Sequence, residues 1–501
     1  MATFVSGDSR DSSSPTLVLL AALGLALLLG AMLAIFRYEI VIAVVLAPVF
    51  LTVAWVLPEL AILVILAVLI GIVPASMVPS LPVAGGQLRG EDFFVIVLFF
   101  SLLLKKVGQP AGLGGFRPFA APLIFLLVLA IISFINALFF EHNGLKSILQ
   151  EARFFFFWLL APLIVLAINS RRKLNRALVA LGVLALIVSV AAIITQATGV
   201  EVFESSSQDL ITLDKSFSGQ IRTGGRGTNF VVFMFFLIVA RFLLKQTGVI
   251  VAALFGTIFA LEIIGTFGRG LWATTLLGLF LIGWWLGTRN LVKMVLAGTA
   301  IAAVALAAIS VIKPDFLAAA ATRAFSFQEE VKEGSSLNYR YTENRNVIQR
   351  LSKQPLGIGL GGMVHPKFNS IMDDNLRRYV HNGYLYLAAK LGVVALIFPF
   401  WLAWRFYKQS RAMLSDKPID SDRALIIALL AAFVLIMVVS TIQPEWMYHE
   451  GVAFISTLVG LLAVLVNIRR SEAGTEMIST ERGSQANESW DEPRMHTPAY
   501  V

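Results

Sequence analysis

The sequence predicts an all-α fold: a polytopic membrane bundle of about 12–14 transmembrane helices with one large external loop. Two observations predict it. Of the 501 residues, 57% are hydrophobic and only 14% are charged, and long apolar runs recur along most of the chain. A soluble domain carries about 25% charged residues, so this composition suits contact with lipid rather than water.

The expected spans are apolar runs close to the roughly 17–25 residues that cross a bilayer, and the shorter runs need their flanks. They lie at 17–36, 40–57, 59–73, 92–104, 119–140, 154–169, 174–196, 229–244, 247–265, 270–288, 291–312, 383–404, 424–442 and 450–467. Pro58 divides the second run from the third, which we interpret as a tight turn. One long kinked helix is the alternative, and it would make the count odd. The first run is long, which favours an uncleaved helix over a signal peptide.

Clusters of Lys and Arg predict the orientation of the bundle, because cytoplasmic loops are enriched in these residues. With fourteen spans and a cytoplasmic N-terminal segment 1–16, every cluster falls on one side. The clusters lie at 105–117, 171–176, 241–245, 289–293, 405–423 and 469–470. The transmembrane bundle then covers 17–470. The polar stretch 471–501, rich in Ser, Glu, Thr and Pro, is predicted to be a disordered cytoplasmic tail.

Two long segments, 197–228 and the loop 313–380, are predicted on the opposite side. Loops of this length are usually functional. Within the larger one, Val347, Ile348 and Leu351 stand at helical spacing, which predicts an amphipathic helix across the mouth of the bundle. Pro355 and several glycines should end this helix in a flexible or closely packed turn.

Arginines flanked by glycines stand at the outer ends of two apolar runs, in "IRTGGRGTNFVVF" and "GTFGRGLWATTL". They are Arg222, Arg226 and Arg269. Glycine allows close approach of a ligand, and the planar guanidinium binds phosphate oxygens in a bidentate manner. Arg340 begins the polar face of the external helix, and His381 with Asn382 stands where a membrane helix resumes.

The composition also excludes some chemistry. The chain has no cysteine, so thiol catalysis and disulfides are excluded, and its five histidines show no metal-ligand spacing. We therefore expect no metal and no cofactor. Glu262 is the acid that lies well inside an apolar run, and such residues are functional candidates.

The order of these features resembles the O-antigen ligase and O-antigen polymerase family of bacterial membrane proteins. The shared elements cover roughly 220–400. They are "GRG" at Arg269, an external helix led by Arg340 that ends in "PLGIGLG", and His381-Asn382 followed by Tyr384. The chain has only "VHNGYLYL" around the histidine, where ligases carry a longer His- and Gly-containing pattern, so ligase and polymerase both stay open.

The resemblance implies a membrane glycosyltransferase of the C-type architecture, in the bacterial cytoplasmic (inner) membrane and active at its periplasmic face. The donor would be a glycan linked to undecaprenyl diphosphate. The acceptor would be lipid A–core for a ligase or another repeat unit for a polymerase, with a chain-length regulator protein as a further partner. Nucleic acid is not an expected partner.

The residues fit this chemistry. Negative charge develops on the departing diphosphate, and arginines would neutralise it. We assign this role to Arg222, Arg226, Arg269 and Arg340. His381 is the candidate general base for the acceptor hydroxyl, and Glu262 is the second catalytic candidate.

Structural explanations compete with each assignment. Arginines at helix ends often anchor a helix at the membrane surface, and Arg340 could pair with Glu343 or Glu333. Arg345 and Arg350 are expected to face solvent or headgroups, Phe154–Trp158 to face lipid, and 443–454 to form an aromatic belt. The alternative function is a flippase or another polysaccharide transporter. Such a protein would show internal repeats and several mid-membrane charges.

Overall fold

The computed structural model describes most of the chain from residue 48 onward. The described residues are 48–73, 80–83, 86–106, 112–200, 202–203, 216–217, 220–221, 223, 226–312, 314–325, 336–365, 378–416 and 418–488. The predicted N-terminal segment 1–16 and span 17–36 lie outside them.

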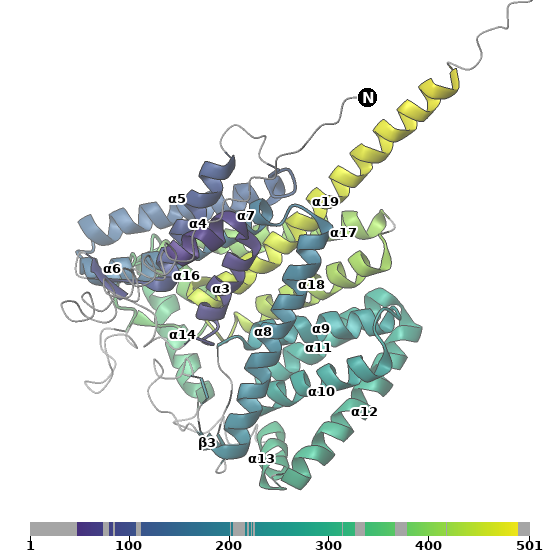
Figure 1. Ribbon diagram of the computed structural model, residues 1–501. Helices are drawn as coiled ribbons and strands as arrows, with labels where there is room; N and C mark the ends of the chain where they lie inside the picture. Colours follow the sequence, from purple (N-terminus) through teal and green to yellow (C-terminus); the bar gives the residue numbers. More distant parts are fainter. Residues whose placement is uncertain are drawn as a thin grey trace, which may run out of the picture.

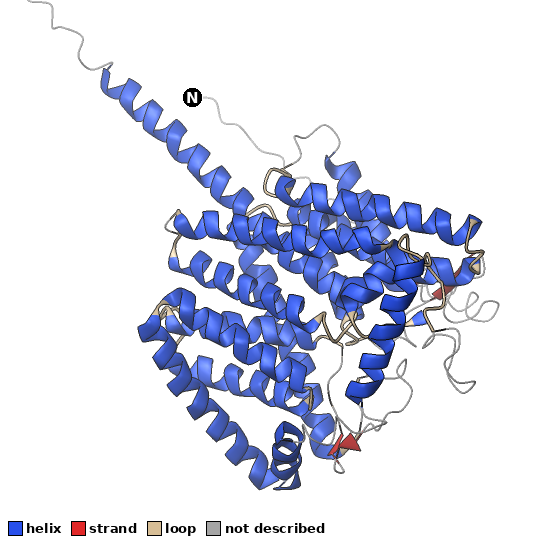
Figure 2. Ribbon diagram, turned by 180° about the vertical axis from the view of Figure 1, so that it is seen from behind, coloured by secondary structure: helices blue, strands red, loops and turns tan. Residues whose placement is uncertain are grey.

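Helices make up the body of the protein, as the sequence predicts (Figure 2). The first half contains α3 (Pro58–Leu69), α4 (Gly90–Lys106), α5 (Arg117–Phe139), α6 (Leu145–Ala152), η2 (Arg153–Leu159), α7 (Leu160–Ala167), α8 (Arg171–Thr198), α9 (Thr228–Leu243) and α10 (Val249–Gly265). The second half contains α11 (Arg269–Leu286), α12 (Thr288–Ile312), α13 (Pro314–Phe325), α14 (Ser336–Lys353), α16 (Gly383–Leu391), η5 (Val393–Leu396), α17 (Ile397–Ser415), α18 (Asp420–Val439), η6 (Glu445–Met447) and α19 (His449–Glu488).

Two short antiparallel ribbons stand outside the helical body. Strand β1 (Ser80–Val83) pairs with β2 (Gly86–Arg89), with Ser80 opposite Arg89. Strand β3 (Ser216–Phe217) pairs with β4 (Gln220–Ile221), with Ser216 opposite Ile221. Each ribbon lies in a connection between apolar helices, so neither changes the all-α class of the fold.

Six helical segments among the described residues are long and apolar enough to cross a membrane, and three further apolar helices are shorter. The six are Arg117–Phe139, Leu145–Ala167, Arg171–Thr198, Arg269–Leu286, Asp420–Val439 and His449–Ala473. The apolar window of His449–Ala473 is 94% buried, against 28% for Arg117–Phe139. Helix α19 therefore forms the centre of a polytopic membrane bundle, and α5 lies at its edge.

The predicted break before Pro58 is present. Residues 48–56 are helical, Leu57 leaves the helical conformation with φ −128° and ψ 65°, and α3 begins at Pro58. Proline suits this position because it lacks the N–H that a first helical residue cannot use within the helix.

The expected single span 383–404 is wrong in one respect, because it is interrupted. Helix α16 ends at Leu391, Gly392 adopts φ 89°, and α17 begins only at Ile397. The turn after α14 docks at this break, where the N–H of Val393 donates to the carbonyl of Pro355 at 2.9 Å. The glycine-rich turn therefore takes over hydrogen bonds that a continuous helix would have made internally.

That glycine-rich turn is closely packed. Gly359 and Gly361 both adopt φ of 72°, and a Cβ at Gly359 would lie 2.7–2.9 Å from atoms of Ala137 on α5. The Nδ2 of Asn143 donates to the carbonyls of Ile358 and Leu360, each at 3.0 Å. Of the two alternatives for this turn, the structure shows close packing against α5 and α6.

A buried ion pair fixes the same turn from the other side. The Nζ of Lys390, with 0% of its side chain exposed, donates to Glu151 Oε1 at 2.7 Å and to the carbonyl of Gly362 at 2.6 Å. Glu151 Oε2 accepts the N–H of Gly361 at 2.7 Å. These charges are compensated by one another and by backbone groups, as buried charges require.

Two of the predicted cytoplasmic clusters meet at one end of the bundle. Arg171 at the start of α8 contacts Asp422 of α18 at 2.6 Å, and Arg469 of α19 contacts the same carboxylate at 3.2 Å. Figure 1 shows α19 projecting beyond the helical body, with α6, α14 and β3 on the opposite side of the molecule. We call the end that contains Asp422 the basic end.

The predicted disordered tail differs from what is observed. Helix α19 continues without a break from the bundle to Glu488. Glu472 lies on this continuation and contacts Arg171 at 2.9 Å, so an ion pair holds the first turn beyond the bundle to α8. Residues 489–501 lie outside the described part of the chain.

Candidate active site

His381 stands immediately before α16, at the end of the bundle opposite the basic end. Asn382 is the N-cap of that helix, and its side-chain oxygen accepts the N–H groups of Tyr384 and Leu385, each at 3.1 Å. This capping arrangement fixes the backbone that carries His381. The two residues of the "HN" pair therefore have different roles: Asn382 caps α16, whereas the side chain of His381 is 20% exposed.

The carboxylate of Glu343 holds His381 in place. It accepts the backbone N–H of His381 at 2.9 Å, and both carboxylate oxygens lie 3.2 Å from Nδ1 of the ring. Glu343 is only 1% exposed, so this carboxylate is inside the protein. Carboxylate contact at Nδ1 favours the tautomer whose Nε2 can accept a proton.

Arg340 and Glu343 form no ion pair within the part of the chain that the structure describes, and Glu333, the other expected partner of Arg340, lies outside it. Glu343 lies four residues before Val347, which is fully buried, so both residues belong to the inner face of α14. That spacing was the available signal for a buried acid. It was missed because the sequence does not reveal that His381 meets this face.

A second histidine faces the same carboxylate. Nε2 of His365 lies 3.8 Å from Glu343 Oε1, and the residue is 4% exposed. Burial lowers the pKa of His365 below its ordinary value, although the negative charge of Glu343 acts in the opposite direction. His365 is thus a second, buried histidine that faces the carboxylate of Glu343 alongside His381.

The ring of Tyr379 packs against the ring of His381. The two rings meet edge to face with centroids 4.9 Å apart. Burial raises the pKa of Tyr379 well above its ordinary value, nearby Tyr448, Glu343 and Glu445 raise it further, and the positive charge of Arg340 lowers it. Arg340 is therefore close enough to act on the phenol that contacts His381. Its buried Nε has no hydrogen-bond partner within the described residues.

The turn between α18 and α19 lies between His381 and the predicted arginines. The N–H of Gly383 donates to the carbonyl of Ser440 at 2.7 Å. A Cβ at Gly270, next to Arg269, would overlap the side chain of Ile442 in the same turn. Gly383, two residues after His381, and Gly270, next to Arg269, thus pack against the same turn.

Glu445 connects this turn to α9. Its Oε2 accepts from Nδ2 of Asn229 at 3.4 Å, and the residue is 6% exposed. Burial raises the pKa of Glu445 to about 7, and the hydrogen bond from Asn229 opposes that change. Trp446 is fully buried and stacks on Trp158, so the expected aromatic belt at 443–454 is wrong: these side chains are core, not lipid-facing.

Arg226 lies at the start of α9, next to the first turn of α19. Its Nε is 3.1 Å from Glu450 Oε1, and Nε2 of His449 is 3.7 Å from the same oxygen. The side chain of Arg226 is 13% exposed and packs over Gly71, where a Cβ would lie 3.1 Å from its Cδ. Arg226 is thus a partly buried cation with one carboxylate contact.

A second arginine lies close by on η2. Arg153 contacts Glu91 Oε1 at 3.0 Å and Asp92 Oδ1 at 3.7 Å, and the next residue, Phe154, stacks on the ring of His449. Phe157 is fully buried and Trp158 is 6% exposed. The expected lipid-facing band at Phe154–Trp158 is therefore wrong for Phe157 and Trp158, which the 3-10 turn directs inward, whereas Phe156 is 40% exposed.

Glu262 lies on α10 and faces the start of α9, where Thr228 follows the Arg226-Gly227 turn. Its Oε1 accepts the hydroxyl of Thr228 at 2.7 Å, and the residue is 1% exposed. This bond joins the two helices. Among the described residues, Glu262 does not contact His381, and its catalytic role stays a prediction.

The remaining arginines have three different placements. Arg222 lies outside the described residues. Arg269 begins α11 after Phe267, whose φ is 50°, and is partly exposed. Arg350, expected to face solvent or headgroups, instead donates to the carbonyl of Met363 at 2.6 Å. Among the residues described, no group of three or more His, Asp or Glu side chains could hold a metal ion.

The fold and this site define a polytopic helical membrane protein with a histidine–carboxylate pair and several arginines near one end of its bundle. Residues 250–400 match the family model described as O-Antigen ligase. The resemblance found in the motifs is therefore confirmed over residues 250–400. The matched family implies a glycosyl-transfer type of activity on lipid-linked glycans. No curated relative matches the chain.

Proposed function

We propose that this protein transfers a glycan from undecaprenyl diphosphate to an acceptor hydroxyl at the periplasmic face of the bacterial inner membrane. The single observation that carries the proposal is the contact between His381 and the buried carboxylate of Glu343. A histidine oriented in this way at the rim of a membrane bundle suits a general base for a hydroxyl group. The basic end is then cytoplasmic, following the placement of Lys and Arg.

The reaction has one bond-forming and one bond-breaking event. The acceptor oxygen forms a bond to the anomeric carbon of the donor sugar while its proton passes to Nε2 of His381. The bond between the anomeric carbon and the diphosphate oxygen breaks, and the electron pair leaves with undecaprenyl diphosphate. Glu343 stabilises the imidazolium that results, because its negative charge lies 3.2 Å from Nδ1.

Arginines supply the charge that receives the leaving diphosphate. Arg340 is favoured by its proximity to Tyr379 and by a buried Nε without a hydrogen-bond partner in the described part of the chain. Arg269 is favoured by the packing of its neighbour Gly270 on the same turn that contacts Gly383. Arg226 and Arg222 complete the proposed set, with Arg226 already held by Glu450.

The acceptor distinguishes two versions of this function. A ligase would use lipid A–core, and a polymerase for O-antigen or exopolysaccharide would use another lipid-linked repeat unit. Glycan electrophoresis of a deletion strain separates them. Polymer that accumulates on the carrier lipid without attachment indicates a ligase, whereas attachment of single repeats indicates a polymerase.

Single variants test the site itself. His381→Ala and Arg269→Ala should each abolish transfer in the complemented deletion strain while the protein stays at normal levels in the membrane. Matched controls are His142→Asn and Arg411→Ala, which change an exposed histidine and an exposed arginine away from the turn. Full activity of both site variants would refute the proposed site.

A further inference from the structure

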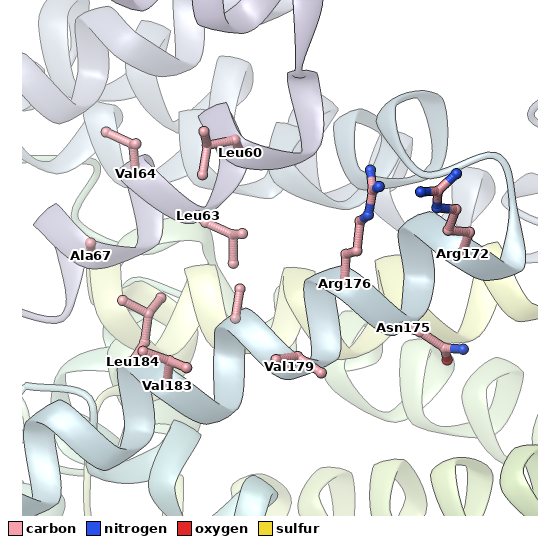
Figure 3. Close-up of a pocket in the computed structure, with 11 residues that line it drawn as sticks. Leu60, Leu63, Val64, Ala67, Arg172, Asn175, Arg176, Val179, Val183 and Leu184 are labelled. Atoms are coloured by element: carbon pink, nitrogen blue, oxygen red, sulfur yellow. The ribbon is translucent and has the colours of Figure 1, made fainter.

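A groove of about 920 Å³ runs between α3 and α8, away from the candidate active site. Its walls are mostly apolar, with Leu60, Val64 and Ala67 on α3 facing Val179 and Val183 on α8 (Figure 3). Val179 is 67% exposed and Val183 is 50% exposed. These side chains therefore offer an apolar trough that the described residues leave uncovered.

Two arginines mark one end of the groove. Arg172 and Arg176 are four residues apart on α8, so they share a helix face, and Figure 3 shows both guanidinium groups on the same side of that helix. Their neighbours have carboxylate contacts: Arg171 with Asp422, and Lys173 with Glu59 at 3.5 Å. Arg172 and Arg176 form no ion pair with any residue that the structure describes, and both are exposed.

The position of the groove along the membrane normal follows from α8. Arg171, directly before Arg172, contacts Asp422 at the basic end. From Arg172 to Leu184, the last lining residue, α8 rises about 18 Å at 1.5 Å per residue. Half of a bilayer's hydrocarbon core is about 15 Å thick. The groove thus extends from the headgroup level of one leaflet to about the bilayer midplane.

We propose that this groove binds an anionic phospholipid from the leaflet at the basic end. Its phosphate is held by Arg172 and Arg176, which present guanidinium forks suited to phosphate oxygens. One acyl chain lies along Val179, Val183 and Val64. The occupant is a bulk phospholipid rather than the glycan carrier, because the groove opens at the end opposite His381, where the proposed reaction takes place.

The absence of cysteine allows a direct test with a single reporter. Val179→Cys in the full-length protein is labelled with a small fluorophore and reconstituted into phosphatidylcholine vesicles that contain brominated phosphatidylglycerol or brominated phosphatidylcholine as quencher. We expect brominated phosphatidylglycerol to produce the same quenching as brominated phosphatidylcholine at a mole fraction that is lower by about fivefold or more. A second reporter, Ile124→Cys on the lipid-facing side of α5, should show the two lipids quenching equally.

Charge variants identify the cause of any preference. When Arg172→Ala and Arg176→Ala are added to the Val179→Cys reporter, the two brominated lipids should quench at nearly equal mole fractions. The control, Lys408→Ala with Arg411→Ala, removes the same charge from exposed α17 positions at the basic end and should leave the preference for phosphatidylglycerol intact. An unchanged preference in the groove variant would overturn the proposal. So would protection of the reporter from both quenchers, which would indicate a protein segment in the groove.

The carrier lipid is tested in the same assay. Undecaprenyl phosphate added to the vesicles should not relieve quenching by phosphatidylglycerol when it is present at a lower mole fraction than that lipid. Relief under those conditions would assign the groove to the carrier and contradict a phospholipid site. Because none of these measurements involves transfer, their outcome is independent of the proposed catalytic function.

Discussion

Glu343 and His381 are 38 residues apart in the sequence, yet the carboxylate accepts the backbone N–H of His381 at 2.9 Å and faces its ring Nδ1 at 3.2 Å. One buried side chain therefore fixes both the backbone and the ring orientation of the candidate base. A side chain with both functions should affect catalysis even though it need not touch the substrate.

Glu343→Gln should lower the rate of transfer by about 10²-fold or more, because the amide can keep the backbone hydrogen bond but cannot stabilise an imidazolium. A positioning role also predicts a change in the pH–rate profile, since the substitution removes a negative charge that lies 3.2 Å from the ring of His381. The measurement is transfer by the purified full-length protein across pH. Gln349→Ala, on the exposed side of α14, is the control and should behave as wild type. An unaltered profile with normal rate would remove Glu343 from the site.

Lys390→Met should strongly destabilise the protein, because it leaves Glu151 buried without its cation. Breaking a buried pair from one side costs about 3–5 kcal/mol. Lys390→Met combined with Glu151→Gln removes both charges and should recover much of this loss, giving a large coupling energy. Thermal unfolding of the purified variants measures it. Additive effects of the two substitutions would argue against the pair.

Gly359→Ala tests the packing of the glycine-rich turn. The substitution places a Cβ against the backbone of Ala137 and requires alanine to adopt φ of 72°. We therefore expect the free energy of unfolding to fall by about 1–3 kcal/mol or more. Gly298→Ala on α12 is the matched control, because nothing lies within 4 Å of its Cβ position. Equal melting temperatures for the two variants would mean that the turn is loosely packed.

Glu445 makes stability depend on pH. Its pKa is raised to about 7 by burial, so the native protein holds a proton that the unfolded chain releases near pH 4.5. Stability contributed by this group is therefore present at low pH and is lost as pH rises through 7. The free energy of unfolding of Glu445→Gln, measured relative to wild type, should therefore rise by on the order of 2–3 kcal/mol between pH 5 and pH 8. Parallel stability curves for the two proteins would contradict this assignment.

The sequence was a good guide where a single periodicity decides the structure. The apolar runs predicted the all-α membrane fold, Pro58 predicted the break at Leu57, and the spans from 174 to 288 agree closely with α8, α9, α10 and α11. Periodicity could not reveal the interruption at Gly392, because that break depends on the docking of Pro355 from a distant turn.

The candidate site was predictable in kind rather than in detail. Residue type and position singled out His381 and the arginines near helix ends, but the partners of these residues come from other helices. To predict the role of Glu343, one would have to know which face of α14 meets α16. To predict that of Glu445, one would have to know that the turn after α18 is buried. Both acids stand among aromatic or charged neighbours, so composition alone suggested a surface.

Hydrogen bonds to buried carboxylates hold the chain in place on both sides of the interval between His365 and Arg378. Before it, Gly361 is bonded to Glu151, and after it, His381 is bonded to Glu343. Changes in the length or sequence of that interval should therefore leave His381 and Glu343 in contact, because neither hydrogen bond depends on the residues between them.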